Sequence, residues 1–143
     1  SHFVVLDTAP TGHTLLLMDA TGAYHRQMAR EFSAGARIVT PLMRLQDPDH
    51  TRILLVTLPE ATPVSEAAAL QDDLRRAGIE PYAWVMNRSL LGSGTRDPLL
   101  AHRLEGERTQ MQRVAGLAKK VCRVPWQAEP PVGLTALRRL TAA

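Results

Sequence analysis

The sequence predicts an α/β fold, a doubly wound and mostly parallel sheet with helices between its strands. Four short apolar runs read as strands: Phe3–Asp7, Arg52–Thr57, Tyr82–Asn87 and Val121–Val124. The first three are almost continuously apolar, which is typical of parallel strands covered on both faces. The runs start about 50, 30 and 40 residues apart, which leaves room for a crossover helix between each pair.

The first apolar run begins almost at the start of the chain, so we expect a sheet that is incomplete at its N-terminal side. Asp7 ends this run, and a turn to Gly12 leads into an apolar helix expected from His13 onward. Ligands of open α/β sheets bind beyond the carboxyl ends of the strands. An acid there suits Mg²⁺, held directly or through water, while Gly12 lets the backbone approach a phosphate. A helix cap with a tight turn explains the same residues equally well.

Helices are expected between the strands, and their ends are marked in the sequence. Thr62 followed by Pro63 indicates a cap, and the apolar spacing that follows ends at Gly78. The segment before the second strand is less regular. Residues 24–32 fit a helix, whereas residues 33–49 contain enough Gly and Pro to be a loop or a mobile segment.

Asp97 followed by Pro98 marks a further helix in the same way. Its apolar stripe consists of Leu100, Leu104, Met111, Val114, Ala115 and Ala118, although two glycines within it weaken the helix by about 1 kcal/mol each. A last short helix is expected near Gly133. With 143 residues in total, these elements fit a single domain.

Polar residues follow the second and third strands, where ligands are expected. Asn87 ends the third strand, and its amide can donate and accept at once, the pairing that reads an adenine edge. An Asn that satisfies loop backbone is the alternative. Glu60 and Glu66 flank a helix start, where the helix dipole stabilises a carboxylate in any case.

Composition excludes several classes of function. The chain has a net charge of +3 but only two Lys, with two Trp, two Tyr and two Phe, so a basic stripe for nucleic acid is not expected. Its longest apolar runs are far short of the ~20 residues that a membrane helix needs, so no membrane insertion is expected. Cys122 is the single cysteine, which indicates a reducing cytosol, and its strand context favours a small buried hydrophobe. His25, His50 and His102 lack zinc-type spacing and are expected at the surface.

Residues 7–14, Asp-Thr-Ala-Pro-Thr-Gly-His-Thr, resemble the signature of arsenical pump-driving ATPases. Residues 56–67 and 84–90 are similar to the same family, and the resemblance extends from residue 3 to about 140. It is closest to the second half of the duplicated bacterial pump ATPase. The resemblance implies a P-loop NTPase-like fold of the deviant Walker A kind, with residues 1–143 as the C-terminal part of one ATPase domain.

The resemblance also implies roles for particular residues near the phosphates. Asp7 would contribute to the Mg²⁺ environment as a carboxylate that acts through water, and the turn to Gly12 would sense the terminal phosphate. His13 would be a metalloid ligand. Without the resemblance, a His at a helix start is more often a polar cap or a surface residue.

Around the base, the resemblance implies that Asn87 holds adenine and that Glu60 lies near the nucleotide. Pro125 and Trp126 follow the fourth strand and are similar to the segment that packs against the base. A partly buried core position would explain Trp126 as well.

The function implied is that of a cytosolic ATPase, peripheral to the membrane, that energises a membrane pump exporting arsenite or antimonite. ATP and Mg²⁺ would be its cofactors and the metalloid its effector. The partners would be the other half of the ATPase, or a second subunit, and the pump. This chain contains no Gly-rich loop ending in Lys-Ser/Thr and one thiol, whereas soft metalloids prefer several thiolates. We therefore expect no ATP hydrolysis by the chain alone.

The sequence leaves two other functions open. A targeting ATPase for tail-anchored membrane proteins would need a Cys-x-x-Cys pair and a Met-rich groove, and neither is visible. A catalytically inactive module that binds or regulates on its own is the other alternative. It predicts a stable monomer in solution.

Overall fold

The computed structural model describes residues 3–8 and 39–141, which fall into two compact units. The larger unit is formed by residues 53–69 and 81–141, and the smaller one by the described residues before 53 together with 70–80. Gly12, His13 and the helices expected from His13 and over residues 24–32 lie outside the described residues.

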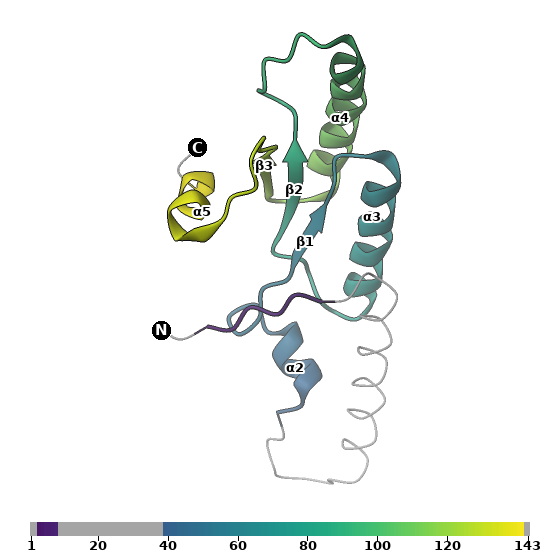
Figure 1. Cartoon of the computed structure of the whole chain (residues 1–143). Helices are drawn as coiled ribbons and strands as arrows, with labels where there is room; N and C mark the ends of the chain where they lie inside the picture. Colours follow the sequence, from purple (N-terminus) through teal and green to yellow (C-terminus); the bar gives the residue numbers. More distant parts are fainter. Residues whose placement is uncertain (1–2, 9–38, 142–143) are drawn as a thin grey trace, which may run out of the picture. The chain divides into compact units, whose positions relative to one another are not determined.

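The larger unit contains a three-stranded parallel sheet in the order β1-β2-β3 (Figure 1). Its strands are β1 (Leu54–Thr57), β2 (Ala83–Ser89) and β3 (Val121–Pro125). The helices α3 (Ala61–Arg76) and α4 (Pro98–Leu117) make the two crossovers. Right-handed crossovers that step in one direction place their helices on one side of a sheet, which is where Figure 1 shows the first part of α3 and all of α4. The expectation of parallel strands is confirmed.

The side chains of the sheet alternate between a buried and a more exposed face. Leu55 and Thr57 are buried in β1 and stand in register with the buried Trp84 and Met86 of β2. Val56, by contrast, is 62% exposed. On the same face of the central strand β2, Ala83 and Val85 are half-buried, so the expectation of cover on both faces stays a prediction. A continuous apolar run indicates what a strand is able to bury, but the second covering layer must come from other segments.

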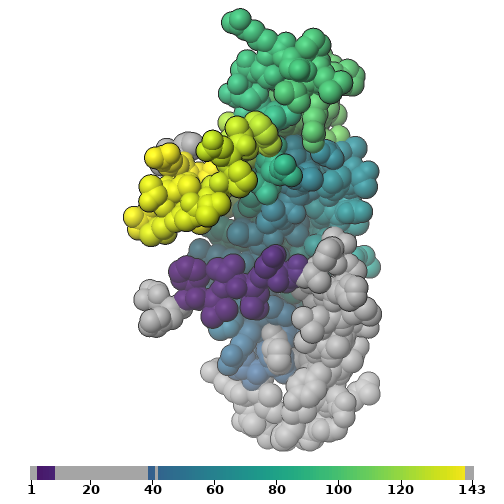
Figure 2. Space-filling view, in the orientation of Figure 1, coloured from purple at the N-terminus to yellow at the C-terminus, as the bar shows by residue number. Residues whose placement is uncertain are grey.

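The predicted strand Phe3–Asp7 is wrong for the described structure. Residues 3–8 carry no strand, and Phe3, Val4, Val5 and Leu6 are 79–85% exposed. Figure 2 draws this segment in purple. An extended apolar run becomes a buried strand only when a neighbouring strand supplies hydrogen bonds and another layer covers its side chains. Neither is provided to Phe3–Asp7 by the described residues.

Most helix ends agree with the predicted signals. Asp97 caps α4 by accepting hydrogen bonds from the N–H groups of Leu99 and Leu100 at 2.8 and 3.1 Å. Gly78 ends α3 with a φ of 75° and donates to the carbonyl of Arg75. The start of α3 differs from the prediction, because the helix already begins at Ala61 and Thr62 lies inside it. The last helix, α5 (Gly133–Thr141), starts where expected.

The smaller unit corrects the prediction of a loop over residues 33–49. A short helix, α2 (Pro41–Gln46), begins after Thr40, whose Oγ1 accepts a hydrogen bond from the Met43 N–H at 3.3 Å. Thr followed by Pro is the same start signal that occurs at other helices, but one and a half turns leave little periodicity to detect. Gln46 then donates from Nε2 to the carbonyl of Ala77 at 2.8 Å. No described helix is both long and apolar enough to cross a membrane.

Candidate functional site

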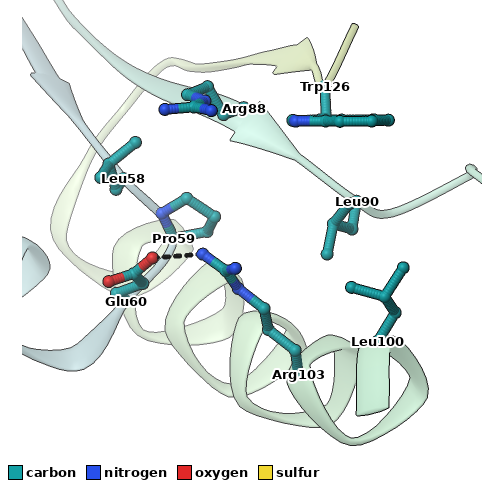
Figure 3. Close-up of a pocket in the computed structure, with 8 residues that line it drawn as sticks. All are labelled: Leu58, Pro59, Glu60, Arg88, Leu90, Leu100, Arg103 and Trp126. Carbon is teal, nitrogen blue, oxygen red and sulfur yellow. Dashed lines mark hydrogen bonds and ion pairs between the residues drawn. The ribbon is translucent and has the colours of Figure 1, made fainter. Parts of the chain in front are cut away.

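A pocket of about 370 Å³ lies at the carboxyl ends of the strands in the larger unit (Figure 3). Each strand contributes to its wall through the residues at or after its end, and α4 contributes two more. The lining residues are Leu58, Pro59 and Glu60 after β1, Arg88 and Leu90 around the end of β2, Trp126 after β3, and Leu100 and Arg103 on α4. Parallel strands bring their carboxyl ends to the same edge, which is why residues so distant in sequence meet here.

The end of β2 contains a bulge that faces this pocket. The register of β2 with β3 shifts between Met86 and Ser89, and Arg88 has a φ of 58°, the single positive φ among the described non-glycine residues. The Asn87 side-chain oxygen accepts a hydrogen bond from the Arg88 N–H at 2.9 Å. Left-handed backbone at a long side chain is costly and concentrates at functional sites. The bulge brings Arg88 into the lining of the pocket.

Asn87 therefore occupies a different position from the one predicted. It does not end its strand, since β2 continues for two residues to Ser89. Asn87 lies within the bulge, and it is the next residue, Arg88, that lines the pocket. Bulges arise from the pairing of two strands, so the sequence of one strand did not reveal this one.

Glu60 lines the pocket and is held by α4. Arg103 donates to the Glu60 carboxylate at 2.5 Å, and Figure 3 shows this ion pair beside Pro59. Glu60 also accepts, through its carbonyl, the N–H of Val64 in the first turn of α3 at 3.1 Å. Glu66, the other acid named from the sequence, is exposed in α3 and is not among the lining residues.

Trp126 forms the wall that follows β3. Its side chain lines the pocket while 46% of the residue stays exposed, so it is not a core residue. Its backbone N–H donates to the carbonyl of Ser89 at 2.8 Å, which ties the end of β3 to the end of β2. Pro125 is the last residue of β3 and is half-buried, outside the lining of the pocket.

Three charged residues in or beside this pocket were not singled out in the sequence: Arg88, Arg103 and Glu107. Glu107 is 2% exposed on α4, and its carboxylate accepts hydrogen bonds from Ser89 Oγ and from the N–H of Leu90 at 2.9 Å. A signal for Glu107 was present, because it stands three positions after Leu104 and so falls in the apolar stripe of its helix. The apolar stripe of a helix faces the core, and a carboxylate buried there needs hydrogen-bond donors to replace water.

Of the phosphate-side residues predicted from the sequence, Asp7 alone is among the described residues, and it belongs to the smaller unit, whereas the pocket belongs to the larger one. Asp7 is exposed in the segment that carries no strand, and Gly12 and His13 lie outside the described residues. Within residues 3–8 and 39–141, no three His, Cys, Asp or Glu residues gather closely enough to hold a metal ion. His50 and His102 are exposed, as predicted.

The prediction that Cys122 is buried is wrong. Its thiol belongs to an exposed residue of β3, which lies at one edge of the three-stranded sheet. Strand context gave the wrong expectation because burial depends on the layer that covers a strand. Its neighbours in the strand, Val121 and Arg123, are exposed as well.

The chemistry of the pocket combines apolar walls with opposite charges. Five apolar residues line it: Leu58, Pro59, Leu90, Leu100 and Trp126. Two guanidinium groups and one carboxylate share the remaining wall, and the carboxylate is already paired with Arg103. A planar ring that carries an anionic substituent matches this lining, because indole and guanidinium planes both stack on rings.

No protein-family model matches the chain. Over 139 residues, 96% of its length, the chain is 55% identical to an arsenical pump-driving ATPase of Acidiphilium multivorum and 54% identical to arsenical pump-driving ATPases of Escherichia coli. The chain spans about a quarter of the length of these relatives. The resemblance predicted from the sequence is confirmed, and the coverage agrees with the expectation of a segment of a longer protein.

Proposed function

We propose that this chain is a segment of an arsenical pump-driving ATPase and that its pocket receives the adenine end of ATP. In this proposal the chain is the C-terminal part of one P-loop NTPase-like, doubly wound domain of the deviant Walker A kind. The observation that carries the proposal is the convergence of Glu60, Arg88 and Trp126 at the carboxyl edge of one parallel sheet, beside the Asn87 bulge. That edge is where nucleotides bind in open α/β sheets.

The base would be held by contacts of two kinds. The Trp126 indole and the Arg88 guanidinium offer planar faces, and stacking of a base on an aromatic side chain is worth about 1–3 kcal/mol. Asn87 adjoins them in the bulge and offers an amide that both donates and accepts, as an adenine edge requires. Pro125, directly before Trp126, restricts the backbone from which the indole projects.

The phosphate end would be served by the segment that contains Asp7, Gly12 and His13. A carboxylate such as Asp7 suits Mg²⁺ held through water, because the phosphates of ATP and water molecules supply the other oxygen ligands. Mg²⁺ would supply charge neutralisation at the phosphates, and Asp7 would help to hold it through water. The Gly12 turn would lie against the terminal phosphate.

The described residues do not by themselves fit a bound metalloid. Arsenite and antimonite prefer several thiolates, and the chain has one thiol, Cys122. Among the described residues, Cys122 does not form a metal-binding cluster with His, Asp or Glu side chains. In this proposal the effector site takes its thiols from elsewhere in the ATPase, and His13 supplies one further donor. Cys122 has no part in it.

The remaining parts of the proposal concern the whole protein. The ATPase would be cytoplasmic, would pair this segment with its other half or a second subunit, and would drive a membrane pump for arsenite or antimonite. This chain contains no Gly-rich loop ending in Lys-Ser/Thr. Because phosphoryl transfer relies on such positioning and charge neutralisation, the segment alone would bind the base without hydrolysing ATP.

Ligand titration of the 143-residue chain tests the proposal. In ¹H–¹⁵N spectra, adenosine and ATP should shift the indole N–H of Trp126 and the backbone N–H of Arg88, whereas ribose 5-phosphate should not. Trp126→Ala should weaken adenosine binding about 5- to 100-fold, the loss of one stacked base. Glu66→Gln, at an exposed acid outside the pocket, is the matched control and should bind like the parent chain.

Two results would count against the proposal. If ribose 5-phosphate produced the same shifts as adenosine, the pocket would be a phosphate site instead. If adenosine shifted other signals but left those of Arg88 and Trp126 unchanged, the base would bind elsewhere. A parallel assay of phosphate release is expected to detect no ATP hydrolysis, and Mg²⁺-dependent turnover lost in Asp7→Ala would contradict that part.

A further inference from the structure

Glu107 is a buried carboxylate with an unusual concentration of donors around it. Ser89 Oγ donates to Oε1, and the backbone N–H groups of Leu90 and Leu91 donate to Oε2 at 2.9 Å and Oε1 at 3.4 Å. Burial of a carboxylate is costly unless hydrogen bonds replace the water that it loses. All three donors belong to one short stretch of chain, the end of β2 and the residues that follow it.

That stretch supports two walls of the pocket. Leu90 lines the pocket directly and is bonded to Glu107 through its N–H. Ser89 is bonded to Glu107 through its hydroxyl, while its carbonyl accepts the N–H of Trp126 at 2.8 Å. One carboxylate on α4 is therefore connected to the wall after β2 by one bond and to the wall after β3 through a single intervening residue.

The same contacts bracket the strained residue. Arg88 lies between Asn87, whose side-chain oxygen accepts the Arg88 N–H, and Ser89, which Glu107 holds. A non-glycine residue at a φ of 58° persists only where the surrounding structure fixes it from both sides. Arg123 also donates to the Leu91 carbonyl, but Glu107 holds Ser89 and the Leu90 N–H, which are nearer to Arg88, so without the carboxylate the bulge would relax on that side.

We propose that Glu107 is a positioning residue for the pocket: its carboxylate fixes Ser89–Leu91 so that Arg88, Leu90 and Trp126 line one cavity. Glu107 is not among the lining residues, so it acts through the backbone that it binds. The identity of the ligand rests on the function proposed above, whereas the positioning itself rests only on these hydrogen bonds. A purely structural role in joining α4 to the sheet is the alternative.

The first experiment compares the N–H signals of the pocket residues in ¹H–¹⁵N spectra of the ligand-free chain. The chain has two tryptophans, Trp84, which is 1% exposed in the core, and Trp126 in the pocket wall. Their indole N–H signals are told apart with Trp126→Phe. In Glu107→Ala we expect the Trp126 indole and the Arg88 N–H to shift while the Trp84 indole stays in place. Glu105→Ala, an exposed acid two positions away on α4, should leave all three signals unchanged.

Variants that remove fewer hydrogen bonds than Glu107→Ala should change the pocket by smaller amounts. Glu107→Gln keeps the length and one acceptor oxygen, so it should move the Trp126 indole by less than Glu107→Ala does. Ser89→Ala removes one donor and should shift it in the same direction. With adenosine as the probe, Glu107→Ala should bind about 10-fold more weakly than the parent chain, and Glu107→Gln should lose less, in line with the worth of one or two hydrogen bonds.

The outcomes separate the two roles. A folded Glu107→Ala whose Trp126 and Arg88 signals stay in place overturns the proposal, even if its unfolding free energy falls, because that is what a purely structural tie predicts. If Glu107→Ala does not fold, Glu107→Gln and Ser89→Ala decide in its place: shifts at Trp126 support the proposal and unmoved signals overturn it. If the parent chain does not bind adenosine, the proposed function is wrong, but the ligand-free test of Glu107 remains valid.

Discussion

Arg103 and Glu60 stand 43 positions apart in the sequence, yet the guanidinium donates to the carboxylate at 2.5 Å. The pair joins α4 to the loop after β1 and so fixes one side of the pocket. Both side chains remain about half exposed, at 60% and 44%. An ion pair this open to water contributes little to stability, so its significance is the position it gives to two charged groups of the pocket.

A double-mutant cycle checks this ion pair. Arg103→Ala, Glu60→Gln and the double variant should give a coupling free energy of about 0.2–1 kcal/mol by urea denaturation, and added salt should reduce it. Arg108→Ala, at an exposed arginine of the same helix, should show no coupling to Glu60→Gln. A coupling that is several times larger and does not respond to salt contradicts the exposed geometry.

The backbone of Arg88 offers a test of strain. Arg88→Gly should raise the free energy of unfolding by about 0.5–1 kcal/mol, because glycine adopts a φ of 58° without the cost that a side chain meets there. Arg88→Val should lower it. Arg96→Gly, in an exposed loop position without positive φ, should not stabilise the chain. Denaturation curves that rank Arg88→Gly below the parent chain contradict a strained bulge.

The two tryptophans should respond very differently to truncation. Trp84 is buried in β2, and Trp84→Ala should cost about 3–5 kcal/mol of unfolding free energy through the cavity that it leaves. Trp126 is about half exposed, and Trp126→Ala should cost less than about 1 kcal/mol. Equal losses in thermal denaturation would show that Trp126 belongs to the core, contrary to its place in the pocket wall.

Asp97 gives a local test of α4. Asp97→Ala removes the acceptor for the N–H groups of Leu99 and Leu100 and should cost about 1 kcal/mol. Asp97→Asn keeps an acceptor oxygen and should cost only a few tenths of that. Glu129→Ala, an exposed acid in a loop, is the control and should be neutral. The measurement is urea denaturation followed by circular dichroism, and a neutral Asp97→Ala contradicts the cap.

The exposed thiol of Cys122 can be checked by chemical modification. The native chain should release one equivalent of thionitrobenzoate from Ellman's reagent without denaturant, because the thiol is reachable from solvent. Cys122→Ser should release none. A thiol that reacts only after guanidinium chloride is added would support the buried position predicted from the sequence and contradict the described structure.

Much of the fold could be predicted because the relevant signals are local. Asp97 with Pro98 marked the start of α4, and Gly78 marked the end of α3. The apolar runs that became β1, β2 and β3 were each found within three residues of their ends. Caps and alternations depend on neighbours within one or two turns of the chain, and the sequence lists those neighbours directly.

The candidate site could be predicted only in part. Glu60 and Trp126 were named from the sequence and line the pocket, whereas Asn87 lies in the bulge beside it and the role predicted for its amide stays a prediction. Arg103 looked like any charged residue on a solvated helix face. Its importance comes from a carboxylate 43 residues away, a relation that no local pattern contains.

By itself, the sequence determined the alternation of strands and helices from residue 52 onward and the parallel direction of the strands, and it predicted the edge at which a ligand site should lie. Only the tertiary structure decided that Arg88 adopts a bulge, that Glu107 is buried beneath it, and that Cys122 and Phe3 are exposed. The reason is physical: helix and strand preferences arise within a few bonded neighbours, whereas register and burial depend on which distant segments pack together.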